Sequence, residues 1–289
     1  MKLLQKYRAP LLFLLLFEGI AVGLWLWLDN PFYLFNFSYI GGGLSLAIAL
    51  YIRGFRHARL VAQLLVGGYM LVYLGLIRGE NMQIEGFWYY LFLGVFEAAA
   101  IHYAVAKIAG PLFFGRGWCG YACWTAMVLD LLPYPVAAQP RRRWGWIRLA
   151  TFAAALLFVA LLFHLRLPNL EQVMFRSFVA GNLAYYAAGV LLAFRLKDNR
   201  AFCKYLCPVA VFLKPASYFA RLRVTCDEDK CVSCGKCRQV CPMDVDMTDN
   251  RRSRANGTEC ILCGRCIEAC PTNALKLSYV SCCKTDFFL

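Results

Sequence analysis

Residues 231–242 read Cys-Val-Ser-Cys-Gly-Lys-Cys-Arg-Gln-Val-Cys-Pro, and residues 260–271 read Cys-Ile-Leu-Cys-Gly-Arg-Cys-Ile-Glu-Ala-Cys-Pro. Both segments follow the pattern C-x2-C-x2-C-x3-C-P, and the second copy begins 29 residues after the first. A tight turn lets three closely spaced thiolates face one metal centre, and eight thiolates at this spacing are typical ligands of two [4Fe–4S] clusters. The two copies therefore predict a small C-terminal α+β ferredoxin domain that holds two clusters.

The fourth cysteine of each copy is expected to ligate the cluster of the other copy. One cluster is therefore assigned to Cys231, Cys234, Cys237 and Cys270, and the second to Cys260, Cys263, Cys266 and Cys241. The alternatives are zinc binding, which does not need this crossed pattern, and a disulfide framework, which would require an oxidising compartment. Gly235 and Gly264 hold the same place in the two copies, which indicates an internal duplication.

The rest of the chain has the composition of a membrane protein. Its 289 residues are 61% hydrophobic with a mean hydropathy of +0.53, whereas a soluble protein is about 45–50% apolar. The net charge is +14, but residues 223–289 carry 10 Lys and Arg against 9 Asp and Glu, so the basic excess lies in residues 1–222. Lys and Arg gather in the cytoplasmic loops of membrane proteins, so we do not predict nucleic-acid binding.

The apolar runs predict a polytopic bundle of six transmembrane helices. Each run has 17 to 21 residues, enough to cross about 30 Å of hydrocarbon at about 1.5 Å per residue. Only a helix satisfies its own backbone groups in lipid at this length. The six predicted spans are residues 10–28, 36–52, 59–77, 87–107, 146–164 and 178–196.

The distribution of basic residues predicts how the bundle is oriented. Sixteen Lys and Arg residues fall on one side of these spans, and only Arg78, Arg166 and Arg176 fall on the other. By the positive-inside rule, both termini and the ferredoxin domain are cytoplasmic, and the protein lies in the cell inner membrane. A reducing cytoplasm also suits a chain with 15 cysteines.

Two C-x3-C pairs lie outside the ferredoxin motifs, one after the fourth predicted span and one after the sixth. They are Cys119 with Cys123 and Cys203 with Cys207. If each pair is helical, its two thiols share one helix face. Arg116, Arg200 and Lys204 lie close by in sequence, and nearby cations lower thiol pKa values. Three interpretations remain open: four ligands of a third Fe–S cluster, redox-active dithiols, or buried inert cysteines.

The two C-x3-C pairs and the double ferredoxin motif together resemble the membrane-bound polyferredoxins of the NapH/NosR/CcoG type. The resemblance covers about residues 110–275, with Gly115-Arg116-Gly117-Trp118-Cys119 before the first pair. It implies electron transfer between the quinone pool or a cytoplasmic donor and a periplasmic or assembly partner. Trp124 stands where the group usually has proline, so the resemblance does not identify one member of the group.

Ionisable residues inside the predicted spans suggest where a quinone would bind. Glu18 lies in the first span, and Glu97 and His102 lie in the fourth. Such residues usually line a pathway or pair with another group, and a quinone needs a hydrogen-bond partner and a proton carrier. Glu97 and His102 are therefore the candidate catalytic residues, with a protonated, hydrogen-bonded Glu as the alternative.

The sequence thus divides into four predicted parts. They are the bundle (1–197), a membrane-surface linker (198–222), the ferredoxin domain (223–280) and a C-terminal tail (281–289) that contains Cys282 and Cys283. The leading hypothesis is a membrane-anchored protein that passes electrons between its clusters and a quinone or a redox partner protein. An assembly factor that reduces a metal ion or a partner disulfide is the alternative, and a redox sensor is a third class.

Overall fold

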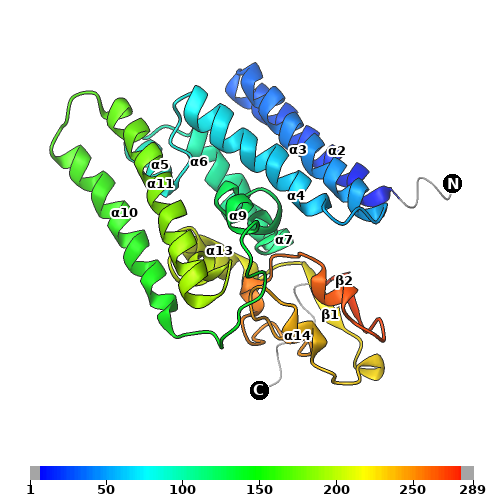
Figure 1. The fold of residues 1–289 in the computed structure, drawn as a ribbon. Coiled ribbons are helices and arrows are strands. Elements are labelled where there is room, and N and C mark those ends of the chain that lie inside the picture. Colours follow the sequence, from blue (N-terminus) through cyan, green and yellow to red (C-terminus); the bar gives the residue numbers. More distant parts are fainter. Residues whose placement is uncertain (1–6, 281–289) are drawn as a thin grey trace.

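The computed structural model describes residues 7–280 and consists mostly of helices. Figure 1 shows the long helices side by side, with the cysteine-rich C-terminal part against one end of the bundle. The N-terminal helices α2 and α3 lie at one edge, and the helices α10 and α11 lie at the opposite edge. Shorter helices lie between these two pairs, and two of them, α7 and α13, contact the C-terminal part.

Short helical segments alternate with long helices along the chain. The elements of the first half are α2 (Arg8–Leu28), α3 (Pro31–Ile52), α4 (Ala58–Ala62), η1 (Gln63–Gly67), η2 (Tyr69–Ile77), α5 (Ile84–Leu93), α6 (Ala98–His102), η3 (Tyr103–Ala109), α7 (Gly110–Phe114), α8 (Gly117–Tyr121) and α9 (Trp124–Leu129). Those of the second half are η4 (Trp144–Trp146), α10 (Ile147–His164), α11 (Leu170–Leu196), α12 (Ala201–Tyr205), α13 (Ala210–Tyr218), β1 (Leu222–Cys226), η5 (Glu228–Lys230), α14 (Lys236–Gln239), η6 (Gly257–Glu259), α15 (Arg265–Glu268) and β2 (Leu275–Tyr279).

Five helices among the described residues are long and apolar enough to cross a membrane. They are Arg8–Leu28, Pro31–Ile52, Ala58–Ile77, Trp144–His164 and Leu170–Leu196. They match the predicted first, second, third, fifth and sixth spans. Many of their large apolar side chains are exposed, Leu26 and Leu191 among them, which is the arrangement expected where lipid surrounds a bundle.

The fourth predicted span, residues 87–107, is not one helix. Helix α5 ends at Gly94, which adopts a left-handed conformation with φ of +72°, and this conformation commonly terminates helices. A new helical segment follows, and its apolar part runs from Ala99 to Phe114. Six continuous spans are therefore not confirmed, because glycine geometry and a short non-helical segment interrupt the apolar run.

Helix α5 begins inside the bundle. The residues before it, Asn81 and Gln83, are buried, and the Asn81 Nδ2 donates to the carbonyl oxygen of Met174 on α11 at 3.0 Å. Phe87 of α5 stacks on Tyr103 of η3 with ring centroids 5.1 Å apart. The chain thus re-enters the bundle before α5 and reverses after it, and side chains of neighbouring helices satisfy its polar groups.

The cysteine-rich C-terminal part is a two-stranded antiparallel sheet with two short helices. Strands β1 and β2 pair with Leu222 opposite Tyr279 and Cys226 opposite Leu275. Backbone angles repeat at the 29-residue spacing of the motif. The pairs with positive φ are Ser233 with Leu262, Gly235 with Gly264, and Asp244 with Asn273. The same turn is therefore built twice, as expected of an internal duplication.

The re-entrant turn gives a first prediction. A Cβ at Gly86 would collide with the carbonyl oxygen of Asn81, so Gly86→Ala should destabilise the protein by about 1–3 kcal/mol, the usual cost of overpacking. Thermal unfolding of the detergent-solubilised protein measures this loss.

Gly19→Ala is the matched control for Gly86→Ala. A Cβ at Gly19 in α2 would meet nothing within 4 Å, and alanine favours a helix by about 0.5–1 kcal/mol over glycine. Equal unfolding midpoints for the two variants would contradict the close contact between Gly86 and the Asn81 carbonyl oxygen.

Candidate iron–sulfur and electron-transfer site

Four cysteines of the ferredoxin motifs line one small cavity of about 10 Å³. They are Cys241, Cys260, Cys263 and Cys266. Cys241 comes from the first motif copy and the other three from the second. The structure thus brings together the four residues that the crossed assignment gives to the second cluster.

The remaining motif cysteines lie nearer the solvent. Cys234 is exposed, and Cys231, Cys237 and Cys270 are partly exposed. Burial and the neighbouring Cys231, Cys237 and Cys270 raise the pKa of the Cys226 thiol to about 11, so Cys270 of the second copy lies on the side of the first. The first cluster's cysteines are thus the more accessible set, and Cys282 and Cys283 lie outside the described residues.

The two C-x3-C pairs converge on one cavity of about 50 Å³. Its lining includes Cys119, Cys123, Cys203 and Cys207. Each pair crosses a helix end, because α8 ends at Tyr121 and α12 ends at Tyr205. The pairs are therefore not presented on one continuous helix face, and the turn after each helix points its second cysteine into the same cavity.

The donor set suits a cluster better than a single metal ion. Within residues 7–280, no three His, Cys, Asp or Glu side chains lie close enough to hold one ion, and the described cysteines are all free thiols. A [4Fe–4S] cluster has four cysteine ligands, each on a different iron, so its sulfur ligands stand further apart than those of one ion. Four cysteines around one cavity therefore fit such a cluster.

Two buried arginines lie beside the C-x3-C cysteines. The Arg116 Nη2 lies 3.8 Å from the Cys119 Sγ, and the Arg200 Nη1 lies 3.9 Å from the Cys203 Sγ. Arg200 also donates to the carbonyl oxygen of Cys119 at 3.1 Å. Its guanidinium is held by Asp130, with Nε to Oδ1 at 2.8 Å.

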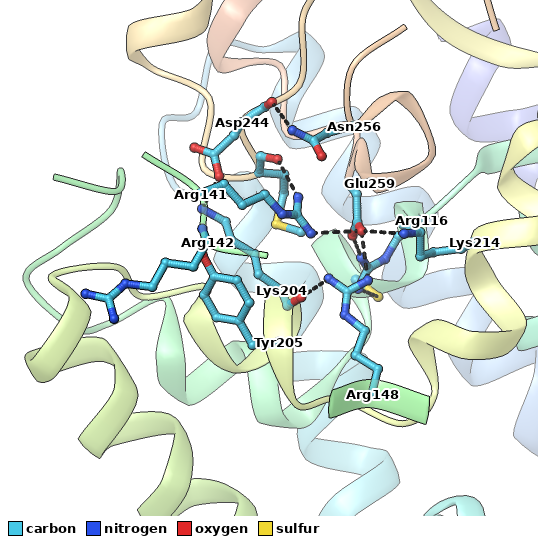
Figure 2. Close-up of polar contacts among 12 residues, drawn as sticks. Arg116, Arg141, Arg142, Arg148, Lys204, Tyr205, Lys214, Asp244, Asn256 and Glu259 are labelled. Atoms are coloured by element: carbon cyan, nitrogen blue, oxygen red, sulfur yellow. Dashed lines mark hydrogen bonds and ion pairs between the residues drawn. The ribbon is translucent and has the colours of Figure 1, made fainter. Parts of the chain in front are cut away.

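Glu259, next to Cys260, is the centre of a buried ionic network (Figure 2). Its carboxylate pairs with Arg116, with Arg148 at 2.8 Å and with Arg141 at 3.0 Å, and Lys214 lies 3.4 Å away. Burial alone would raise the pKa of Glu259, but Arg116, Arg148 and Arg141 outweigh it and hold the pKa well below its ordinary value. The network joins the ferredoxin domain to the bundle.

The second ferredoxin motif packs directly on the first C-x3-C turn. The Tyr121 hydroxyl donates to the carbonyl oxygen of Leu262 at 2.9 Å. A Cβ at Gly120 would collide with the carbonyl oxygen of Ile261, so only glycine allows the two backbones to approach this closely. The turn between Cys260 and Cys263 therefore touches the turn between Cys119 and Cys123.

The expectation that nearby cations lower thiol pKa values does not hold as a net effect at Cys203 and Cys207. Burial raises the pKa of the Cys203 thiol to about 12, although Arg200 opposes the rise. Burial also raises the pKa of the Cys207 thiol to about 11. Desolvation outweighs the positive charge at both positions, so without a metal these groups are protonated thiols at neutral pH.

The two candidate catalytic residues lie in different environments, one exposed and one buried. Glu97 is exposed in the turn before α6. His102 is buried, and its Nε2 has no hydrogen-bond partner among the described residues. His102 lines a cavity of about 420 Å³ between α2, α3 and η3, together with Trp118, whose ring centroid is 5.0 Å from that of His102. Glu18, in contrast, is partly buried and accepts from the Ser38 hydroxyl at 2.7 Å.

Sequence reasoning missed the acidic partners of this network. Glu259 and Asp130 bind arginines 143 and 70 residues away in the chain, so neighbouring sequence gives no sign of the pairing. Arg141 is one of the sixteen basic residues from which the orientation is predicted, and in the structure it also donates to Glu259. One available signal was overlooked: an arginine precedes the first cysteine of both C-x3-C pairs by three residues.

The network around Glu259 gives a second prediction. Glu259→Gln leaves several buried guanidinium groups without their anion, and removing one partner of a buried ion pair costs about 3–5 kcal/mol. We expect a clearly lower thermal unfolding midpoint in detergent. Since its pKa is lowered on folding, the ionised Glu259 stabilises the fold above about pH 4.3, the ordinary Glu value. That stabilisation is lost as the pH falls toward the lowered pKa.

Glu228→Gln is the control, because Glu228 is exposed on the same domain. It should unfold as the unmodified protein does. An unfolding midpoint of Glu259→Gln equal to that of Glu228→Gln would contradict the role given to the network.

Comparisons with known proteins agree with this geometry. A model of the 4Fe-4S dicluster domain family matches residues 223–271. A model of the 4Fe-4S binding domain family matches residues 100–146 and 183–225, which contain both C-x3-C pairs. No solved structure matches the chain significantly.

Three curated proteins are similar over part of their length. The methylamine utilization ferredoxin-type protein MauN of Methylobacillus flagellatus is 30% identical over 53% of this chain and 58% of its own, and that of Paracoccus denitrificans is 29% identical over 44% and 48%. The uncharacterized protein MJ0749 of Methanocaldococcus jannaschii is 24% identical over 60% and 70%. The chain thus spans about half the length of the MauN proteins.

Together, the two iron–sulfur family models and the similarity to MauN support a membrane-associated polyferredoxin family in general, and they do not single out the NapH/NosR/CcoG type.

Proposed function

We propose that this protein is a membrane-anchored relay that passes electrons between cytoplasmic [4Fe–4S] clusters and a quinone. The matches to iron–sulfur domain families and to MauN support an electron-transfer role. The relay has three stations: the two ferredoxin clusters, a third cluster at the C-x3-C cysteines, and the apolar cavity beside His102. The alternative is that a membrane redox protein takes the place of the quinone. The quinol-dependent reduction experiment described below distinguishes the two reactants.

The observation that carries the proposal is the convergence of both C-x3-C pairs on one cavity under the second ferredoxin motif. The four cysteines face one another across that cavity, and the Tyr121 hydroxyl bonds to Leu262 within the second motif. When bound, a cluster at each cysteine set would accept and release single electrons. The chain's own role is to hold the turns that carry the two cysteine sets against each other.

The buried positive charge around the C-x3-C cavity favours an anionic occupant. Lys107 lines the cavity and is buried. It makes no ion pair within residues 7–280, and its ammonium lies 4.4 Å from the Trp118 ring centroid. A buried cation without a counter-ion is costly. A cluster held by four thiolates carries negative charge and would supply that counter-ion.

The exposure of the cysteines suggests the order of the relay. Cys234 of the first cluster is exposed, so a soluble donor or acceptor can approach it. The second cluster's Cys241 and Cys266 are buried at 6% and 5% exposure. Electrons would therefore enter or leave at the first cluster and pass through the second to the membrane surface.

The cavity beside His102 supports a quinone as the membrane-side reactant. It is lined mainly by apolar side chains, with His102, Tyr33 and Asn36 among the polar ones. The His102 Nε2 and the Trp118 Nε1 are both buried without a hydrogen-bond partner among the described residues. A quinol gives up two electrons and two protons. The clusters would take the electrons one at a time. His102 is placed to take one proton, and the carboxylate of Glu80, which also lines the cavity, is placed to take the other.

The proposed orientation follows the positive-inside rule. Tyr7 near the start of the chain bonds to Arg53 at the end of α3, and the Arg59 guanidinium lies 3.3 Å from the Gly120 carbonyl oxygen. Gly120 in turn touches Ile261 of the second ferredoxin motif, so basic residues gather at the end of the bundle that carries the ferredoxin domain (Figure 1). We propose that this end is cytoplasmic and that Ala99–Phe114 makes the fourth crossing.

Redox-active dithiols are less well supported than a cluster. Thiol–disulfide exchange needs access of one sulfur to another, but Cys119 and Cys203 are 7% and 5% exposed. Their burial therefore shields them from a partner protein. A factor that reduces metal ions or partner disulfides would need a more open arrangement than these pairs have.

Iron content tests the third cluster. Anaerobically purified protein should contain about 12 iron atoms per chain, at four per cluster, and the double variant Cys119→Ser/Cys203→Ser about 8. Cys282→Ser is the control: Cys282 stands outside every motif, and its replacement should leave the iron content unchanged. About 8 iron atoms in both the unmodified protein and the double variant would overturn the third cluster.

Quinol-dependent reduction tests the cavity. His102→Leu should lower the rate of cluster reduction by decylubiquinol at least tenfold, because the cavity loses one of its two proton acceptors. Reduction by dithionite should not change, since the clusters stay intact. The rate is followed by the bleaching of the clusters' visible absorption on reduction.

His164→Leu is the matched control for His102→Leu. His164 lies exposed at the end of α10 and does not line the cavity. It should leave quinol-dependent reduction unchanged. If both variants, or neither, lost quinol-dependent reduction, the cavity would not be the quinone site, and a protein partner would take its place in the relay.

A further inference from the structure

The two C-x3-C segments share a longer pattern than their cysteines. Residues 116–123 read Arg-Gly-Trp-Cys-Gly-Tyr-Ala-Cys, and residues 200–207 read Arg-Ala-Phe-Cys-Lys-Tyr-Leu-Cys. Both fit R-x2-C-x-Y-x-C. The arginine of each segment is three residues before a cysteine, so one helical turn brings its guanidinium over that thiol.

The structure shows the same contact twice. The guanidinium of Arg116 lies 3.8 Å from the Cys119 Sγ, and that of Arg200 lies 3.9 Å from the Cys203 Sγ. Both arginines are almost completely buried, at 0% and 1% exposure. Each is fixed from behind by a carboxylate from a distant segment, Glu259 for Arg116 and Asp130 for Arg200.

Each carboxylate is shared with other cations, so neither arginine is fully neutralised. Glu259 also pairs with Arg148 and Arg141. Asp130 also pairs with Arg59. Cations therefore outnumber carboxylates in both of these networks. In a buried site with a low effective dielectric, this excess acts strongly on a charge that changes in the cavity.

We infer that Arg116 and Arg200 are paired positioning residues that set the reduction potential of the centre at the C-x3-C cysteines. This inference rests on the proposed third cluster. Reduction adds one negative charge to that cluster, and two guanidinium groups against its sulfur ligands stabilise the reduced form. Hydrogen bonds to the sulfurs and net charge are known determinants of cluster potentials.

The experiment is a redox titration of the anaerobically purified protein, followed by electron paramagnetic resonance, with Arg200→Gln as the main variant. Asp130 keeps Arg59 and Gln63 as partners in this variant, so its carboxylate is not left unpaired. The midpoint potential of the C-x3-C centre should fall. We expect a change of about tenfold in its reduction equilibrium, which is about 59 mV for one electron.

Three matched variants separate charge from structure. Arg200→Lys keeps the charge and should keep most of the potential, whereas Arg116→Gln should lower the potential as Arg200→Gln does. Lys214→Gln removes a cation from the same network, but Lys214 is 46% exposed and is not among the residues that line the cavity. It should leave the potential of the C-x3-C centre unchanged.

The outcomes are distinct. A third signal that Arg200→Gln and Arg116→Gln lower, and that Lys214→Gln does not, supports the inference. A third signal with an unchanged potential in both Arg→Gln variants overturns the inference and leaves the proposed relay standing. If the unmodified protein gives only two cluster signals and about 8 iron atoms, the third cluster itself is wrong, and the inference falls with it.

Discussion

The buried carboxylate of Glu259 is the contact on which the arrangement of the other parts depends. It immediately precedes Cys260, and it binds Arg116 before the first C-x3-C pair and Arg148 at the start of α10. One acidic side chain thus connects a ferredoxin loop, a membrane-surface turn and a long apolar helix. Because the group is 1% exposed, its ion pairs are poorly screened by solvent, and loss of the carboxylate would leave several buried cations uncompensated.

The second constraint is steric. Gly120 allows the turn of the first C-x3-C pair to lie against the Ile261 carbonyl, and the Tyr121 hydroxyl fixes the register by bonding to Leu262. The ionic network sets which domains meet, and this backbone contact sets how closely they meet. Together they bring two cysteine-bearing loops from distant parts of the sequence into one site.

Local patterns predicted much of this structure. Five apolar runs became five long helices, and the 29-residue repeat reappears in matched left-handed turns at Gly235 and Gly264. The predicted fourth span is not one continuous helix, because Gly94 ends α5 and because the chain at the buried residues Asn81 and Gln83 lies inside the bundle. That re-entry depends on contacts with α11, which an apolar run does not reveal. Glu259 and Asp130 were not predicted for the same reason, since their partners lie far away in sequence. The predicted domain boundaries and ligand assignments stay predictions.

The close packing of the ferredoxin domain on the bundle has a consequence for the proposed electron transfer with a soluble redox partner. Some carrier domains swing on a linker between a distant donor and a distant acceptor. In this protein the glycine contact and the buried ion pairs hold the domain in place, so its travel is confined. The exposed surface at Cys234 would therefore be a docking site in a fixed position for such a partner. The rate of electron transfer with a soluble partner would then depend on the diffusion and concentration of that partner. It would depend little on the length of the segment that connects α13 to β1, residues 219–221.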